Sequence, residues 1–110
     1  MSADAPAVPP SLPVTAHAGW QAYHAMLASK TAYFDFLAAL DRKTLAGGQR
    51  TLAEIAHLDS RLREHTEAVG CFRTAMANLA ASDLAARDAL VAVIGELNQT
   101  LGVEPKPRLH

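Results

Sequence analysis

The sequence predicts an all-α fold, either a three-helix antiparallel bundle or an elongated helical hairpin with a third helix. Apolar residues recur at steps of three and four rather than two, which indicates helices and leaves no convincing strand. Alanine, the residue with the highest helix propensity, is abundant along the whole chain. Only short connections separate the three helical stretches, so neighbouring helices should run antiparallel.

The bulk properties indicate one small domain with a single core. The chain has 110 residues, half of them hydrophobic, and should fold without metals or disulfides. Ten basic and eleven acidic residues give a net charge of −1, so neither nucleic acid nor an anionic membrane is an expected partner. The lone Cys71 favours a reducing cytoplasm, and we find neither a signal peptide nor a membrane-spanning run. We therefore expect a cytoplasmic protein.

The composition divides the chain into three parts. Residues 1–14 are rich in Pro, Ala and Ser and are expected to form a disordered arm. Residues 15–102 should form the helical bundle domain. Residues 103–110 contain two more prolines and should form a flexible tail.

Local signals set the ends of the first two helices. The first helix is predicted over 17–45, with Thr15 as its N-cap and Gly47 or Gly48 as its terminator. The second begins with TLAE at 51–54, a capping box in which the Thr51 hydroxyl caps the helix and Glu54 reaches back. It should continue to about residue 80.

The third helix is predicted to follow almost at once. Ser82 is the expected N-cap, with Asp83 in the first turn. The helix should continue to about Leu101 and stop at Gly102, ahead of Pro105.

The second helix carries a narrow seam of the coiled-coil type, interrupted by a histidine. One row of the seam contains Ile55, Leu62, Val69 and Met76, and the other contains Leu58, His65, Phe72 and Leu79. Antiparallel geometry places His65 level with about Thr31 and about Asn98. We expect Thr31, His65 and Asn98 to form one polar layer that fixes the register of the helices. The alternative is that His65 is a ligand or a proton carrier.

The first helix is apolar over an unusually wide arc. Five of the six aromatic residues of the chain lie on it, and its apolar residues span roughly 200° of the helical wheel, against a little over about 100° for a typical packed helix. Either the third helix or the N-terminal arm covers the surplus, or another chain does. On the last interpretation, the partner-binding residues are Trp20, Tyr23, Met26, Lys30, Tyr33, Phe36 and Leu40. Lys30 suits the edge of such an interface, because its stem can lie along apolar surface.

We recognise no catalytic or metal-binding pattern. The five histidines have no metal-ligand spacing, Cys71 has no supporting histidine, and no cofactor is expected. The one enzymatic alternative is phosphotransfer through His24, within HAMLASK. Histidine phosphotransfer domains usually have lysine and glycine three and four residues after the histidine, where this chain has Leu27 and Ala28.

The helical layout resembles that of flagellar and type III export chaperones, of the FlgN and FliT kind. The resemblance rests on the long leucine-spaced stretch TLAEIAHLDSRLREHTEAV and on a final helix that ends in ELNQTL. It implies a small cytoplasmic helical adaptor that binds the amphipathic segment of a client. We therefore predict a non-enzymatic interaction protein whose partner is a second copy or a helical client, bound through the aromatic face of the first helix.

Overall fold

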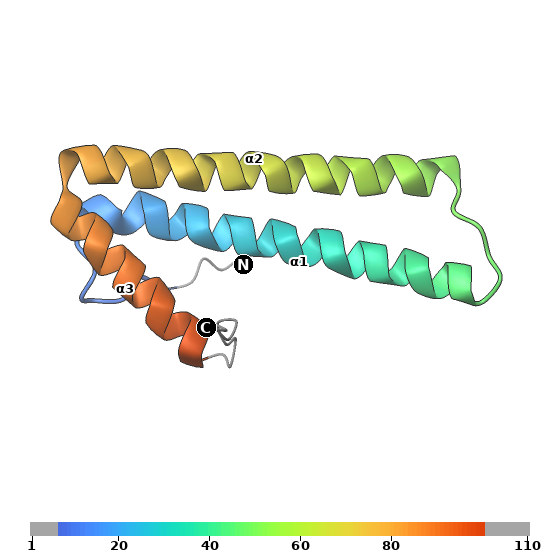
Figure 1. Ribbon diagram of the computed structural model, residues 1–110, viewed down its shortest axis with the longest axis horizontal. Coiled ribbons are helices and arrows are strands. Elements are labelled where there is room, and N and C mark those ends of the chain that lie inside the picture. Colours follow the sequence, from blue (N-terminus) through green and yellow to red (C-terminus); the bar gives the residue numbers. More distant parts are fainter. Residues whose placement is uncertain (1–6, 101–110) are drawn as a thin grey trace, which may run out of the picture.

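A computed structural model describes residues 7–100, and it confirms the all-α fold (Figure 1). A short 3-10 helix, Val14–Ala16, leads into α1, His17–Leu45. The chain then forms α2, Leu52–Ser82, and α3, Leu84–Thr100. Of the two predicted arrangements, the structure is the elongated hairpin with a third helix. The long α1 and α2 lie antiparallel, and the shorter α3 turns away from them (Figure 1).

The turn between α1 and α2 uses the predicted residues. Gly47 has a φ of 97°, which only glycine adopts without strain, and it ends α1. The amide of Gly48 donates to the carbonyl of Lys43, and that of Gly47 donates to the carbonyl of Thr44, as in a Schellman motif. At the start of α2 the Thr51–Glu54 capping box is present in both directions. These bonds satisfy backbone groups that the helix ends leave unpaired.

The caps predicted for α1 and α3 are wrong. Thr15 does not cap α1, because it lies inside the 3-10 helix and its hydroxyl donates to Asp83 Oδ2 at 2.7 Å. Ser82 is still part of α2, and its hydroxyl donates to the Asn78 carbonyl. Asp83 caps α3 instead, since its Oδ1 accepts from the amide of Ala86 at 3.1 Å. The predicted stop at Gly102 lies outside the described residues.

The core lies at the end of the hairpin where α3 begins. Its buried residues come from the N-terminal segment and from all three helices: Leu12, Ala16, Trp20, Leu79, Ala86 and Leu90. Leu12 is only 5% exposed and Val8 packs against the same cluster, so the expected disordered arm is wrong for this part of residues 1–14. Residues 1–6 and the expected tail at 103–110 lie outside the described residues.

A glycine allows α3 to approach α1 closely within this core. A Cβ added to Gly19 would lie 2.7 Å from Leu90 Cδ2 and 3.8 Å from Met76 Sδ. Leu90 is fully buried, so it has little room to move. The contact therefore depends on the missing side chain at position 19.

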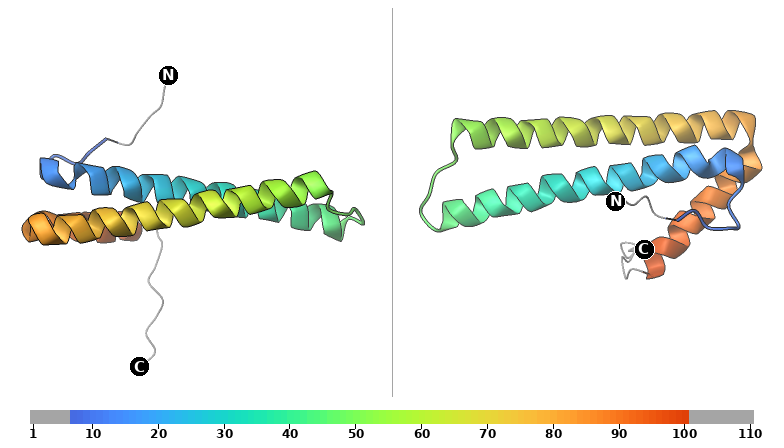
Figure 2. Two further views of the ribbon diagram at one scale, coloured as in Figure 1. Left: turned by 90° about the horizontal axis from the view of Figure 1, so that it is seen from above. Right: turned by 180° about the vertical axis from the view of Figure 1, so that it is seen from behind.

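The fold is longer than a compact domain of its size. Its radius of gyration is 17.3 Å, against roughly 13 Å expected for this number of residues. The α1–α2 hairpin accounts for this length, and the two helices cross at a shallow angle (Figure 2, left). The N-terminal segment and α3 gather at one end, while the half of the hairpin near its turn stands without a third helix (Figure 2, right). None of the described helices is long and apolar enough to cross a membrane.

Candidate interaction surface

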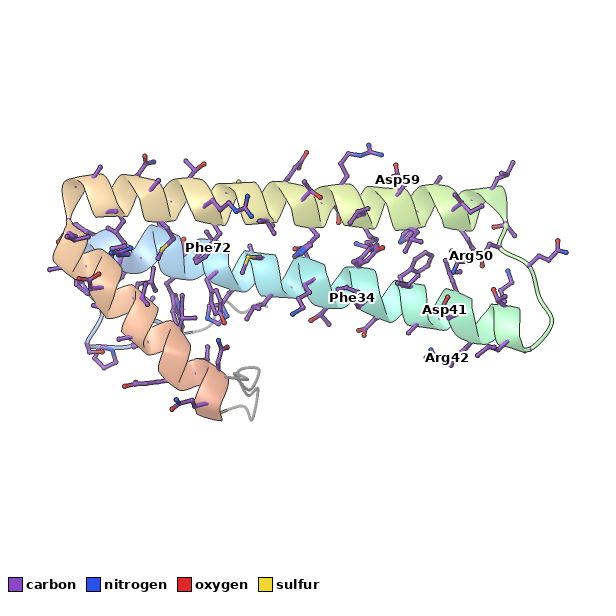
Figure 3. All side chains as sticks on the ribbon, viewed as in Figure 1. Phe34, Asp41, Arg42, Arg50, Asp59 and Phe72 are labelled. Carbon is purple, nitrogen blue, oxygen red and sulfur yellow. The ribbon has the colours of Figure 1, made fainter. Side chains whose placement is uncertain are left out.

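One stripe of α1 begins under α3 and continues beyond it. Gly19 lies against Leu90 of α3, and the hydroxyl of Tyr23 donates to Asn98 Oδ1 at 3.1 Å. Further steps of three and four along the same side of α1 lead through Leu27 and Lys30 to Phe34, Leu37 and Asp41. Phe34 is 51% exposed, and Figure 3 places Phe34 and Asp41 in the half of α1 that α3 does not accompany.

A second apolar stripe lies on α2, and it too begins beside α3 and continues beyond it. Met76 packs against the core that α3 completes. One and two heptads earlier in the sequence, Val69 is half-buried and Leu62 is 43% exposed. Ile55, a further heptad away, is 48% exposed. Leu62 and Ile55, which lie farther from α3, are therefore more exposed than Met76 and Val69.

The two stripes form one surface, because both lie on the side of the hairpin that α3 covers at its other end. We call this surface the open face and define it by six residues: Lys30, Phe34, Leu37, Asp41, Ile55 and Leu62. Phe34, Ile55 and Leu62 are about half-exposed, and Lys30 and Asp41 are exposed. The open face thus combines an apolar centre with one basic and one acidic residue.

The partner-binding residues predicted on α1 are for the most part used inside the chain. Trp20, Tyr23 and Leu40 are buried, so they have almost no surface to offer a partner. Phe36 is half-buried and packs on the imidazole of His57 of α2, with ring centroids 4.4 Å apart. The aromatic arc is wide because it packs against α2, α3 and the N-terminal segment together.

The other three predicted partner-binding residues retain some surface. Met26 and Tyr33 are half-buried, and Lys30 is exposed. Tyr33 packs edge-on against Phe34, with ring centroids 5.0 Å apart, so it borders the open face. Of the seven predicted residues, Lys30 belongs to the open face and Tyr33 borders it, and their role in binding stays a prediction. The seam residues Leu62 and Ile55 are exposed because α3 is short and turns away from the hairpin: it has 17 residues, against 29 in α1. The periodicity of α2 alone does not show this.

The predicted polar layer of Thr31, His65 and Asn98 does not form. Thr31 is exposed. His65 Nδ1 lies 2.9 Å from Ser29 Oγ, whereas Asn98 accepts from Tyr23. These two pairs lie roughly 9 Å apart along α1, because Tyr23 and Ser29 are six residues apart in one helix. The third helix turns away from the hairpin (Figure 1), and its Asn98 meets Tyr23 and not His65.

His24, the candidate for phosphotransfer, lies in an aromatic cluster. Its ring centroid is 4.3 Å from that of Trp20 and 5.2 Å from that of Tyr23. Burial lowers the pKa of His24 and raises the pKa of Tyr23. No protein atom of the described residues bonds the buried nitrogens His24 Nε2 and Trp20 Nε1. A buried Nε2 does not suit attack on a phosphoryl group carried by another protein.

A shallow hollow lies between α2 and the start of α1. Its volume is about 760 Å³, and small side chains such as Ala18, Gly70 and Thr74 leave it open. Cys71 is exposed at its border. Among residues 7–100, no group of three or more His, Cys, Asp or Glu side chains could hold a metal ion. We therefore take the open face, and not the hollow, as the candidate functional surface.

Comparison with known proteins gives no relative for this chain. No protein-family model, no curated protein and no solved structure matches it. The resemblance to export chaperones stays a prediction.

Proposed function

We propose that the protein is a non-enzymatic interaction module that binds another protein through the open face of its hairpin. The observation that carries the proposal is the pair of apolar stripes that start beneath α3 and continue, uncovered, towards the turn. At one end of the stripes α3 already packs on α1, through Leu90 at Gly19 and Asn98 at Tyr23, so the geometry suits a further helix along the uncovered part.

The energetics favour coverage of this face. Full burial of a large apolar side chain stabilises by about 1.5–3 kcal/mol. Phe34, Ile55 and Leu62 are about half-exposed, so a partner that completes their burial would gain roughly 2–4 kcal/mol from these three alone. Scattered exposed residues such as Val14 and Leu45 need no such explanation. Phe34, Ile55 and Leu62 differ because helical spacing places all three on the same side of the hairpin.

The remaining features agree with a binding role. The lone Cys71 is a free thiol and suits the reducing cytoplasm, where we propose that the protein acts. His65 is engaged by Ser29, and His24 is packed among aromatic rings, so neither supports the alternative of histidine-dependent chemistry. We propose protein binding without a cofactor.

Site-specific photocrosslinking in the cells that make the protein tests this proposal. A photoreactive phenylalanine analogue at Phe34 should give one discrete crosslinked protein, whether a second copy or another chain. The matched control is the same analogue at Asp35, which is exposed but points about 100° away around α1. If position 34 gives no product, or the same products as position 35, the proposed binding face is wrong.

A further inference from the structure

We propose that the occupant of the open face is a second copy of this chain, packed antiparallel so that α1 lies against α1 and α2 against α2. The inference rests on the proposed function and names its partner. The result would be a four-helix bundle made of two hairpins, related by a two-fold axis that crosses the helices.

The residues of α1 on the open face are self-complementary about one point. Phe34 and Leu37 lie on either side of a midpoint between residues 35 and 36, and Lys30 and Asp41 share that midpoint. A two-fold axis there exchanges positions at equal distance from it. Phe34 then faces Leu37 of the partner subunit, and Lys30 faces Asp41 of the partner subunit.

The residues of α2 give the same axis independently. Ile55 and Leu62 have their midpoint between residues 58 and 59. The contacts Ser29–His65 and Phe36–His57 set the levels of the two helices, and they place residues 58–59 beside residues 35–36 of α1. One axis therefore brings Ile55 onto Leu62 of the partner subunit while it pairs the residues of α1.

The charges fit this arrangement as well. Lys30 is exposed, and none of the ion pairs found among the described residues uses it. Asp41 is bonded by Arg50 through Oδ1 at 2.8 Å, and its side chain is 58% exposed, so Oδ2 can accept a second cation. The symmetric pairing puts two lysine–aspartate contacts at the rim of the apolar centre.

The position of α3 favours an antiparallel orientation of the two hairpins in the dimer. This helix occupies the same side of the hairpin at the end away from the turn (Figures 1 and 2). When the hairpins overlap by their turn-proximal halves in opposite directions, the two copies of α3 lie at opposite outer ends. The shared surface extends over about 19 residues of α1, which is about 28 Å at the helical rise. Across the two helices it is roughly 20 Å wide. That area is below the roughly 800 Å² per partner of a standard interface, so we expect a weak, reversible dimer.

Another segment of the same chain is a weaker candidate for this place. Residues 101–110 contain Pro105 and Pro107, which cannot continue a helix along the apolar stripes. They also contain no aromatic residue to pack on Phe34. A different helical protein remains the competing occupant, and the experiment below separates it from a second copy.

Sedimentation equilibrium of the full chain, from low micromolar to several hundred micromolar, measures the self-association. We expect a concentration-dependent rise from the monomer mass of 11.7 kDa to twice that value. Phe34→Glu should weaken the dimer at least about tenfold, because two carboxylates would enter its apolar centre. Ala28→Glu, the matched control on an exposed position elsewhere on α1, should leave the association constant unchanged. Circular dichroism of each variant checks that the helices are intact.

A charge exchange tests the antiparallel geometry itself. Lys30→Glu and Asp41→Lys should each weaken the dimer about 3- to 30-fold, because each puts like charges opposite one another twice. The double variant should recover most of the lost affinity, since Glu at position 30 would face Lys at position 41 of the partner subunit. Additive losses in the double variant would overturn the proposed orientation.

The two proposals fail in different ways. A chain that stays monomeric at all concentrations, yet crosslinks from position 34 to another protein, overturns the dimer and leaves the interaction role intact. A monomer without any crosslink overturns both.

Discussion

His65 Nδ1 lies 2.9 Å from Ser29 Oγ, and this contact joins α2 to α1 across the middle of the hairpin. The Ser29 hydroxyl also donates to the carbonyl of Met26 at 2.9 Å. A hydroxyl has one proton to donate, so Ser29 must accept from His65, and the proton of the neutral imidazole is on Nδ1. The histidine in the apolar seam therefore has a specific partner, which supports a structural role for it.

The first prediction concerns the two sides of this contact. Ser29→Ala should lower the free energy of unfolding by about 1 kcal/mol, because the half-buried Nδ1–H of His65 loses its acceptor. His65→Leu should cost less or even stabilise, because Ser29 keeps its bond to Met26 and a leucine suits the seam. Urea unfolding at neutral pH measures both. The reverse order of the two variants would contradict the assignment of donor and acceptor.

The second prediction concerns the close approach of α3 to α1 at Gly19. Gly19→Ala should destabilise by about 1–3 kcal/mol, because the new methyl group would meet Leu90 Cδ2 in a fully packed core. Gly70→Ala is the matched control, since nothing lies within 4 Å of a Cβ there. It should stabilise by up to about 1 kcal/mol through helix propensity alone. Thermal unfolding should show a lower melting temperature than wild type for Gly19→Ala and a higher one for Gly70→Ala.

The third prediction concerns the cap of α3. Asp83→Ala should destabilise by about 1–2 kcal/mol, because it removes both the cap on Ala86 and the bond to Thr15. Ser82→Ala should change stability by less than about 0.5 kcal/mol, since its hydroxyl only returns to the Asn78 carbonyl. Equilibrium unfolding in urea compares the neighbours directly. Equal losses in the two variants would show that the carboxylate does not cap the helix.

The features predicted correctly depend on short-range signals. The span of α1, the capping box at Thr51 and the turn at Gly47 each follow from the chemistry of a few consecutive residues. The cap of α3 lies one position after the predicted Ser82, because Ser82 and Asp83 are both good caps and α2 continues to Ser82. Local propensity alone does not decide between such neighbours.

The features that the sequence did not predict depend on the direction of α3. Asn98 would lie beside His65 only if the third helix ran along the hairpin for its whole length. In the structure α3 turns away, so Asn98 meets Tyr23 instead. For the same reason the seam residues Ile55 and Leu62 are exposed. Crossing angles follow from packing between elements, here the Gly19–Leu90 contact, and no periodicity within one helix reveals them.

The fourth prediction concerns pH and His24. Burial against Trp20 and Tyr23 disfavours the imidazolium, so the pKa of His24 is lower in the folded chain than its ordinary value of 6.5. Between those two pKa values the unfolded chain binds more protons than the folded one, and stability therefore rises with pH. This contribution is fully present above pH 6.5 and is lost as the pH falls through the folded pKa.

Urea unfolding of wild type and His24→Gln at pH 7.5 and pH 5.5 tests this sign. The loss of unfolding free energy between the two pH values should be larger for wild type, because the variant lacks the group whose protonation opposes folding. The other histidines are common to both proteins, so the difference between the two losses isolates His24. An equal or larger loss in the variant would show that the folded chain accepts a proton at His24 as readily as the unfolded chain does. The imidazole would then not be shielded by its aromatic neighbours.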